Sequence, residues 1–461
     1  MGEERRKIQC ELAFPVKGRG EAPRVAGEGT ESPVAKCVTE SPASTERLME
    51  EVCERNNLRK ALKRVKANKG SPGVDGMTVN GLTGYLKEHW PEIREQLLEG
   101  TYKPQPVKRV EIPKPDGGRR KLGIPTVRDR FIQQAVMQVL QGHWDPTFSE
   151  HSYGFRPGRS AHQAVAQAQR YVAEGYGFVV DFDLEKFFDR VNHDKLMGRV
   201  AKRVSDKRML RLIRAFLNAG VMENGLVGPT EEGTPQGGPL SPLLSNLVLD
   251  ELDRELERRG HRFVRYADDS NVYVRSRRAG ERVMESISDF IKRKLKLKVN
   301  RGKSAVDRPS QRKFLGFSFT PGSRPKRRIA PKALKRFKER IRELTRRTRG
   351  VSLGRMVEQL SAYLRGWLGY FAFCETPSVL ADLEAWIRRR LRCVAWKQWK
   401  RGKTRFAELR KRGVNKDLAA QTAGSAHGPF RLSRSPALSF ALPDAYFRSL
   451  GLPKLEVRRV A

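Results

Sequence analysis

Two short runs of aromatic and β-branched residues flank a pair of adjacent acids in the segment Phe263–Val274, and this segment most constrains how the chain can fold. The pattern predicts a β-hairpin with Ala267, Asp268 and Asp269 at or near its turn. An Asp–Asp pair can also serve a turn alone, because Asp suits turns and can hydrogen-bond its own backbone. The apolar strands on either side, however, favour a place in a sheet, where the carboxylates would point at one fixed position.

A second acidic strand has the same composition. It runs from Phe178 to Asp183 and carries Asp181 as well as Asp183. Carboxylates that rigid strands bring together repel one another, and they stay ionised together only if a cation lies between them. A small number of hard oxygen ligands suits Mg²⁺, which keeps other coordination positions for water and substrate phosphate. The two segments therefore indicate a metal-dependent phosphoryl-transfer site.

The charge balance indicates the kind of partner. The 461 residues include 92 Lys and Arg against 52 Asp and Glu, a net charge of +40, and the excess is strongest in the last third. Such a surplus requires nucleic acid or an acidic membrane as partner. The sequence has no run of about 18 apolar residues and no signal-peptide pattern, which favours nucleic acid and no membrane. The five cysteines show no zinc-ligand spacing, so we expect free thiols, a cytoplasmic protein and no zinc-dependent nuclease module.

Apolar periodicity predicts an α+β chain. Residues 1–45 are rich in Gly, Glu, Pro and Ser without such periodicity, so we expect a disordered leader. Proline and basic residues at 321–332 mark a linker and a domain boundary, and the pattern beyond it is helical. Helices are predicted over 45–65, 79–98, 127–140, 161–173, 194–218, 243–257 and 280–295, and strands over 107–113, 178–183 and 313–319.

Three further segments suggest contact with phosphates or other anions. The basic turn Lys114–Lys121 is either a solvated loop or a clamp on phosphates. The glycines of the loop Glu232–Pro242 allow close backbone approach, and the helix that follows favours anions at its start. In the last third, aromatic residues alternate with arginines and lysines. The aromatics suit the core of a small helical domain, whereas the charges need counter-anions such as an RNA or DNA backbone.

In their order along the chain, these segments resemble the motifs of reverse transcriptases, and the best match is to the bacterial group II intron reverse transcriptase/maturases. The resemblance covers about residues 46–420, and the ordered set is very specific although the acid pair alone is weak. The C-terminal motifs resemble the thumb, or maturase, domain and argue against retroviral and diversity-generating relatives. The segments that carry the resemblance are Lys114–Lys121, Tyr153–Arg156, Asp183–Asp189, Pro235–Pro242, Tyr266–Asp269, Lys303, Phe314–Phe317, Trp386–Arg392 and Trp396–Lys400.

The resemblance implies a right-hand polymerase-type fold. Fingers and palm, an antiparallel sheet with helices, would occupy residues 46–320, and a helical thumb/maturase domain would occupy residues 321–420. Residues 421–461 would then be a short basic C-terminal tail, which leaves room only for a small DNA-binding domain.

The resemblance also implies roles for single residues. Asp183, Asp268 and Asp269 would be catalytic and bind two Mg²⁺ ions, with the Leu184 carbonyl as a further ligand. Asp181 fits the spacing less well and is expected to be a supporting charge. Nucleotide binding would involve Lys114 and Arg120 at the triphosphate, Phe188 as the side chain that excludes a 2′-hydroxyl, Gln236 in the nucleotide pocket and Lys303 at the leaving group. RNA binding would involve Arg388, Arg389, Arg390, Arg392, Lys397 and Lys400.

These features together predict an RNA-directed DNA polymerase that also assists the splicing and mobility of a group II intron. Its partners would be the intron RNA, an RNA template with a DNA primer, dNTPs and target DNA. One alternative is a splicing maturase whose polymerase is unused, and the intact acids and Gln236 loop count against it. The other is a host-adopted reverse transcriptase in phage defence, which the maturase-like helices disfavour.

Overall fold

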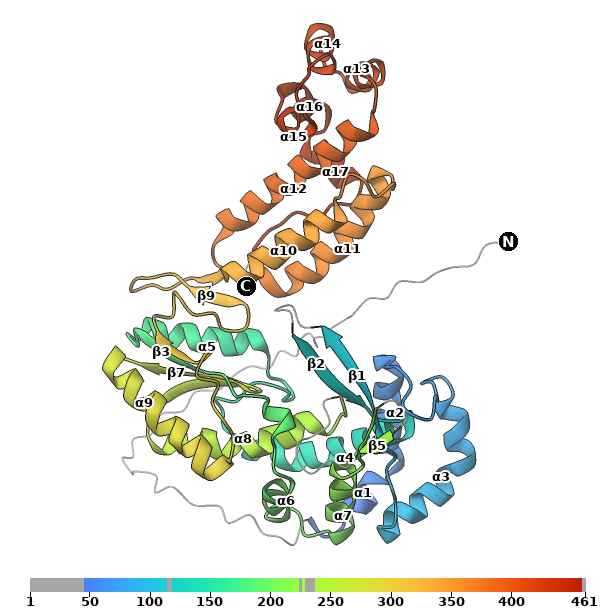
Figure 1. Cartoon of the computed structure of the whole chain (residues 1–461), viewed down its shortest axis with the longest axis vertical. Coiled ribbons are helices and arrows are strands. Elements are labelled where there is room, and N and C mark those ends of the chain that lie inside the picture. Colours follow the sequence, from blue (N-terminus) through green and yellow to red (C-terminus); the bar gives the residue numbers. More distant parts are fainter. Residues whose placement is uncertain (1–44, 114–117, 224–225, 229–236, 458–461) are drawn as a thin grey trace, which may run out of the picture. The chain divides into compact units, whose positions relative to one another are not determined.

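We describe the protein from a computed structural model that covers residues 45–113, 118–223, 226–228 and 237–457; of Arg120 and Asp189 it describes only the backbone. In the first two thirds of the chain the helices are α1 (Leu48–Val52), α2 (Arg55–Asn68), α3 (Leu82–Glu99), α4 (Val127–Trp144), α5 (Ala161–Ala173), α6 (His193–Ala201), α7 (Lys207–Leu217), α8 (Ser241–Arg258) and α9 (Arg277–Phe290) (Figure 1). The short helical turns among them are η2 (Asp145–Thr147), η3 (Phe187–Asp189) and the π-helical η4 (Ile291–Leu295). The later helices are α10 (Pro331–Leu344), α11 (Leu353–Phe371), α12 (Pro377–Gln398), α13 (Gly402–Lys411), α14 (Lys416–Ala423), α15 (Pro429–Leu432), α16 (Pro436–Ala441) and α17 (Asp444–Ser449).

The strands form three sheets. The palm sheet has the antiparallel order β6-β7-β3-β8, and a finger sheet has the order β2-β1-β4-β5, in which only the short pairing of β1 with β4 is parallel. The third sheet is the antiparallel pair β10-β9. The strand bounds are β1 (Val107–Pro113), β2 (Arg119–Ile124), β3 (Phe178–Phe182), β4 (Val221–Glu223), β5 (Leu226–Gly228), β6 (Arg262–Tyr266), β7 (Asp269–Val274), β8 (Ala305–Asp307), β9 (Phe317–Phe319) and β10 (Arg327–Ile329).

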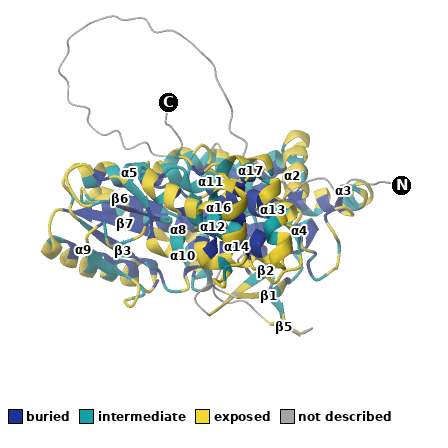
Figure 2. Ribbon diagram, turned by 90° about the horizontal axis from the view of Figure 1, so that it is seen from above, coloured by how far each residue is buried: buried dark blue, intermediate teal, exposed yellow. Residues whose placement is uncertain are grey.

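Successive side chains of the palm strands enter two different apolar clusters. Val180 and Val272 belong to a first cluster, which includes residues of α4, α8 and α9. Val179 and Tyr273 belong to a second cluster, which includes residues of α5 and of α10 to α12. Because the side chains of a strand point alternately to opposite faces, both faces of this sheet are covered. In Figure 2 most residues of β6, β7 and β3 accordingly have the dark blue of buried residues. The hairpin is therefore held rigidly, which an acidic site at its turn requires.

Several predicted elements are confirmed. The strand β1 and the helix α5 have the predicted bounds, and the predicted acidic hairpin is β6–β7. The start of α5 has a local cause, because the Ser160 hydroxyl accepts from the Gln163 N–H and the Gln163 side chain accepts from the Ser160 N–H. This capping box satisfies two backbone donors that the helix itself leaves open. The mixed α+β class and the antiparallel palm sheet are likewise confirmed.

Two predicted helices are divided, which corrects the prediction from periodicity. The helix predicted over 45–65 is α1 followed by α2, and the helix predicted over 194–218 is α6 followed by α7. The second break has a clear cause in Asp206, whose carboxylate accepts from the N–H groups of Arg208 and Met209 and so begins α7. The same carboxylate accepts from the Met49 N–H of α1 at 3.0 Å. Asp206 is therefore a helix start that also joins two distant segments.

The segment predicted to be a linker, residues 321–332, contains ordered structure. Its strand β10 pairs with β9, with Ile329 opposite Phe317, and Pro331 begins α10. Proline suits the first turn of a helix, where its missing N–H has no partner to lose. The proline that suggested a break between domains thus marks a helix start.

The segment predicted to be a basic tail is also folded. Residues 421–461 contain α15, α16 and α17, and Leu438 and Phe447 of these helices are fully buried in the second cluster. Apolar burial of this kind makes the segment part of the helical region around α12. None of the helices in the described ranges combines the length and the apolar composition needed to cross a lipid bilayer.

Candidate active site

The register of the palm sheet gathers the predicted acids on one face. Asp181 of β3 lies opposite Asn271 of β7, and Phe182 lies opposite Ser270. Asp183, which follows directly, therefore continues toward Asp269. Since directly opposite residues of antiparallel strands share a face, and alternate residues return to it, Asp181, Asp183 and Asp269 lie on the same face.

The turn that carries Asp268 is strained. Tyr266 pairs with Asp269, which leaves Ala267 and Asp268 as a two-residue connection, and Ala267 has a φ of 57°. A residue with a Cβ adopts this left-handed conformation at a cost of about 1–2 kcal/mol. Such a conformation persists only where the surrounding structure fixes it, so neighbouring groups must hold the backbone of Ala267 in place.

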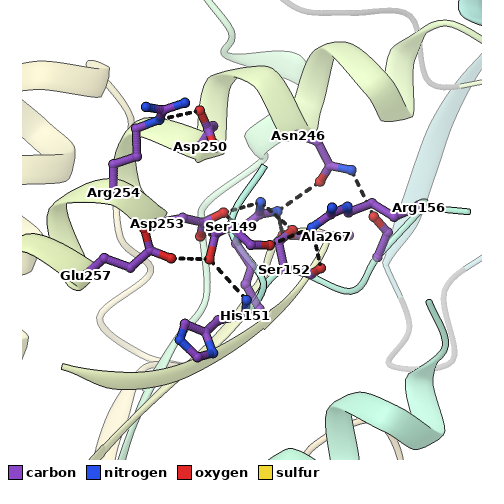
Figure 3. A network of polar contacts seen from close by, with 12 residues as sticks. Ser149, His151, Ser152, Arg156, Asn246, Asp250, Asp253, Arg254, Glu257 and Ala267 are labelled. Carbon is purple, nitrogen blue, oxygen red and sulfur yellow. Dashed lines mark hydrogen bonds and ion pairs between the residues drawn. The ribbon is translucent and has the colours of Figure 1, made fainter. Parts of the chain in front are cut away.

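A buried arginine holds the turn from behind. Arg265 is fully buried, and its guanidinium donates to the carbonyl of Ala267 at 3.0 Å. The same group donates to both oxygens of Asp253, at 2.7 and 2.5 Å, and to the side chains of Asn246 and Ser152, at 3.0 and 2.7 Å. Figure 3 shows Asn246, Asp253, Ser152 and Ala267 close together in this network of polar contacts. Burial raises the pKa of Asp253, and the adjacent guanidinium opposes that rise. The turn is thus fixed to α8 by a charge pair with satisfied hydrogen bonds.

Gly154 closes the other side of the turn. A Cβ built on Gly154 would lie 2.3 Å from the backbone nitrogen of Ala267, so no other residue fits without movement. The Gly154 carbonyl accepts from the Asn246 side chain at 2.9 Å. Tyr153 donates its N–H to the Arg265 carbonyl at 2.9 Å. The motif Tyr153–Arg156 therefore supports the acidic hairpin by direct backbone contact.

Asp181 is neutralised by a residue that the sequence did not single out. Arg312 pairs with the Asp181 carboxylate at 2.6 Å and donates to the Lys303 carbonyl at 2.8 Å. Burial raises the pKa of Asp181, and the hydrogen bond from Arg312 opposes it. Arg312 thereby ties the Lys303 loop to β3. The predicted supporting role of Asp181 is compatible with this pairing and stays a prediction.

The pKa of Asp269 reflects electrostatic repulsion between the neighbouring carboxylates. Asp269 keeps an exposed surface, but the protein atoms around its carboxyl group, followed by the negative charges of Asp181 and Asp268, raise its pKa to about 6, while Lys313 opposes the rise. A divalent cation bound beside these carboxylates would reverse this effect. Their oxygen-only donor set therefore suits Mg²⁺.

The carboxylates are not yet arranged as a closed metal site. Among the described residues, no three His, Cys, Asp or Glu side chains are grouped closely enough to hold one ion. Asp183 is fixed through its backbone, because its N–H donates to the Ser304 hydroxyl at 2.9 Å and its carbonyl accepts from Asn300 at 2.8 Å. The next residue, Leu184, pairs with Val299 in an isolated bridge. The two acidic segments thus supply oxygen donors of the kind that a divalent metal takes.

Phe188 lines a cavity of about 460 Å³ beside the palm. Its other walls include Gly237 and Gly238, which directly follow the predicted Gln236, and Arg130 of α4. The Nε of Arg130 is buried without a hydrogen-bond partner among the described residues, while its Nη2 donates to the Ser71 carbonyl at 2.6 Å. A partly buried cation with a spare donor suits an anionic ligand, and nothing in the local sequence distinguished it. Lys114 and Gln236 lie outside the described residues, as does the side chain of Arg120.

The arginines of α12 contact the protein itself. Arg388 pairs with Asp444 of α17 at 2.6 Å and with Glu384 at 3.1 Å. The other three donate to groups on neighbouring segments. These contacts are Arg389 to the Phe430 carbonyl at 3.1 Å, Arg390 to the Thr345 hydroxyl at 2.6 Å and Arg392 to the Leu442 carbonyl at 3.0 Å. Their predicted role in RNA binding stays a prediction, but the guanidinium groups already serve to hold α12 to α10 and to α15–α17.

The predicted lysines differ, because Lys397 and Lys400 are exposed. Both line a cavity of about 620 Å³, which we call the basic cavity. Its other cationic walls are Arg346, Arg347, Arg349 and Arg405. Arg405 packs over the Trp396 ring at 4.7 Å, and its Nε is buried without a hydrogen-bond partner among the described residues. A cluster of this kind suits phosphate groups.

Two family models match the chain in the order that the motifs indicated. Residues 112–319 match the reverse transcriptase (RNA-dependent DNA polymerase) family, and residues 334–413 match the maturase-specific domain of group II introns. The first match contains the whole palm sheet, and the second contains α11, α12 and the lysines of the basic cavity.

Two relatives are similar to parts of this chain. Protein YkfC of Escherichia coli (strain K12) is 38% identical over 227 residues, which cover 48% of this chain and 60% of that protein. The group II intron-encoded protein LtrA of Lactococcus lactis subsp. cremoris is 32% identical over 325 residues, which cover 56% of this chain and 54% of that protein. The matched region thus spans somewhat more than half the length of each of these relatives.

Proposed function

We propose that this chain, which its two family matches place among the group II intron reverse transcriptase/maturases, copies RNA into DNA and assists the splicing and mobility of an intron RNA. Its substrates would be dNTPs and an RNA template paired with a DNA primer. Its further partners would be the intron RNA and a DNA target. The proposal is supported by the two family matches and by the shared face of Asp181, Asp183 and Asp269.

A reverse transcriptase domain uses a divalent metal, and we propose two Mg²⁺ ions held by Asp183, Asp268 and Asp269, with the Leu184 carbonyl as a further ligand. Bound there, the ions would lower the pKa of the primer 3′-hydroxyl and neutralise the leaving pyrophosphate. Asp183 would act from a backbone fixed by Ser304. Asp268 and Asp269 would act from a turn whose carbonyl Arg265 holds.

For the incoming nucleotide we propose the cavity beside the palm. Phe188 would stand where a ribose 2′-hydroxyl would otherwise fit, and the backbone of Gly237 and Gly238 would approach the ligand closely. Arg130 would add a charge-assisted donor to the predicted phosphate contacts of Lys114 and Arg120. Lys303 would stand at the leaving group, on the loop that Arg312 ties to the catalytic strand.

We propose that the fingers and palm occupy residues 46–320 and that the thumb/maturase domain occupies residues 321–420. The intron RNA would bind to this helical thumb/maturase domain. The buried apolar residues of α15–α17 favour extending this domain through residue 457. Lys397 and Lys400 would contact phosphates from the rim of the basic cavity. A protein that binds the folded RNA better than its unfolded forms shifts the RNA toward its splicing-competent state.

Primer extension on an RNA template with Mg²⁺ and dNTPs tests the proposal. We expect extension by the wild type and loss of at least about a hundredfold in rate for Asp268→Asn or Asp269→Asn, since charge stabilisation of this size is typical at such sites. Asp289→Asn, at an exposed position of α9, is the matched control and should extend like the wild type.

The same assay distinguishes the proposed function from the alternative of a splicing maturase whose polymerase is unused. If the wild type and Asp268→Asn both bind intron RNA and neither extends a primer, the chain is a maturase alone. Extension by Asp268→Asn at the wild-type rate would instead remove that residue from the metal site.

A further inference from the structure

Phe155 combines two unusual properties. Its side chain is 49% exposed, and its backbone φ is 59°. Bulky residues avoid the left-handed region, and the strain of adopting it persists where the surroundings fix the backbone and often where a function uses it. Because the ring is exposed, burial in the core does not offset the cost of this backbone conformation.

The neighbours of Phe155 are fixed on both sides. Gly154 is pressed against Ala267 and accepts a hydrogen bond from Asn246. Arg156 is 9% exposed, and its guanidinium donates to the preceding turn, including the Ser149 carbonyl at 2.5 Å. The Phe155 carbonyl itself accepts from Gln141 at 3.1 Å. These contacts fix the backbone on both sides of Phe155.

The ring lies beside the catalytic turn. Its centroid is 6.5 Å from that of Tyr266, with 40° between the ring planes. Tyr266 is two residues from Asp268, which we propose as a metal ligand. A molecule that touches Phe155 therefore lies next to the site of chemistry.

A second cavity borders the same segment. It has a volume of about 770 Å³, and we call it the α2 cavity. Lys60, Lys63 and Arg64 of α2 line it together with Gln141 and Pro157. Residues three and four apart lie on one face of a helix, so the three cations form a short basic row. One carboxylate, Asp145, also lines the cavity, but Arg156 neutralises it at 2.8 Å.

We propose that Phe155 stacks on a base of a single-stranded nucleic-acid segment that passes the catalytic turn, with the phosphates of that segment along the cations of the α2 cavity. A single exposed ring beside a basic row matches a base and its phosphates, since every base offers a flat face and every phosphate a charge. A protein partner would require a broader apolar patch. The inference rests on the proposed polymerase function, because the polymerase supplies the strand.

Fluorescence anisotropy without Mg²⁺ or dNTPs tests the stacking. The probes are an RNA–DNA primer–template with an unpaired 5′ template overhang, the same duplex with blunt ends, and a duplex with an unpaired primer tail. The variants are Phe155→Ala, Phe155→Trp and Phe155→Gly. Phe440→Ala is the matched control, because Phe440 is 63% exposed and lies on α16.

We expect Phe155→Ala to raise the Kd of the overhang duplex about tenfold and to leave the blunt duplex unchanged. Phe155→Trp should bind like the wild type, because an indole also stacks. Phe155→Gly should bind the overhang duplex as weakly as Phe155→Ala does. Its melting temperature should nevertheless be higher than that of Phe155→Ala, because glycine adopts a φ of 59° without strain. An effect confined to the primer-tail duplex would assign the stacked base to the primer strand.

The cations of the α2 cavity have a separate readout. Lys60→Gln/Lys63→Gln should reduce the slope of log Kd against log salt by about 1.4, and Phe155→Ala should leave that slope unchanged.

Equal Kd values for the wild type, Phe155→Ala and Phe155→Gly would overturn the stacking, and so would a Phe155→Trp variant that binds as weakly as Phe155→Ala. An unchanged salt slope would overturn the phosphate path. If the wild type binds the primer–template but does not extend the primer, the polymerase proposal is refuted, whereas the binding results for the Phe155 variants still stand.

Discussion

The edge of the palm sheet and the C-terminal half of α12 each concentrate one sign of charge. At the sheet edge, three carboxylates share a face, and within the described residues Arg312 pairs with Asp181 while Asp183 and Asp269 form no ion pair. On α12, Arg388, Arg389, Arg390 and Arg392 all donate to groups of the protein. Two of the three carboxylates of the first region thus have no ion pair within the described residues, whereas the arginines of the second region hold α12 to its neighbours.

This difference separates charge that serves binding from charge that serves folding. Neighbouring carboxylates that raise the pKa of Asp269 carry a repulsion that a bound cation would relieve. The half-buried guanidinium groups of α12 each already donate to a group of the protein, and burial followed by neighbouring arginines lowers the pKa of Arg389, Arg390 and Arg392. The RNA contacts proposed for this helix are therefore better supported at Lys397 and Lys400, which are exposed at the basic cavity.

The largest effect is expected where a charge is both buried and paired. Arg265→Met should lower the free energy of unfolding by about 3–5 kcal/mol, because it leaves the Asp253 carboxylate buried without its partner. Arg265→Lys should recover part of the loss, since one ammonium cannot reproduce the two-pronged contact. Urea unfolding measures both. A loss below about 1 kcal/mol for Arg265→Met would mean that the palm tolerates an unpaired charge as readily as the surface does.

The next effect concerns the turn itself. Gly154→Ala should lower the primer-extension rate by about a hundredfold, because a Cβ placed 2.3 Å from the Ala267 nitrogen must displace the acidic turn. Gly198→Ala, on α6 with open space around it, is the control and should keep full activity. Full activity of Gly154→Ala would show that the acids do not depend on this backbone contact.

The comparison of the two kinds of cation on α12 predicts opposite outcomes. Arg388→Ala should destabilise the protein by about 1 kcal/mol by removing contacts to Glu384 and Asp444, and it should leave the salt dependence of RNA binding unchanged. Lys397→Gln/Lys400→Gln should leave stability within about 0.5 kcal/mol and reduce the salt slope by about 1.4. Thermal melting and RNA titrations at several salt concentrations measure the two effects. If Arg388→Ala reduced the salt slope and Lys397→Gln/Lys400→Gln did not, the arginines and not the lysines would contact the RNA phosphates.

The smallest effect is a pH-dependent one at the acids. The pKa of Asp269 is about 6 in the folded protein, above the ordinary value of 3.8, so its ionisation opposes folding fully above pH 6 and less as the pH falls from 6 to 4. Asp269→Asn should therefore raise the melting temperature in EDTA by about 2 °C at pH 8 and by less at pH 5. Asp289→Asn should show no such trend. A gain that grows toward low pH would contradict the proposed repulsion.

The sequence by itself was enough to recognise the family. The acid pair, the second acidic strand and the order of the surrounding motifs predicted a reverse transcriptase/maturase, and the two family matches confirm that recognition. Strand alternation and turn residues also predicted the hairpin β6–β7 and the bounds of β1 and α5. These features are local, because they follow from the periodicity and the capping chemistry of neighbouring residues.

Only the tertiary structure decided which charges are engaged and which are available. The contact of Arg265 with Ser152 joins residues 113 positions apart, and that of Arg312 with Asp181 joins residues 131 positions apart. The exposed ring of Phe155 and the spare donor of Arg130 depend likewise on segments far away in the chain. A run of arginines has one appearance in the sequence whether its members face solvent or neighbouring helices. The partner of each group is set by long-range packing, which local periodicity does not encode.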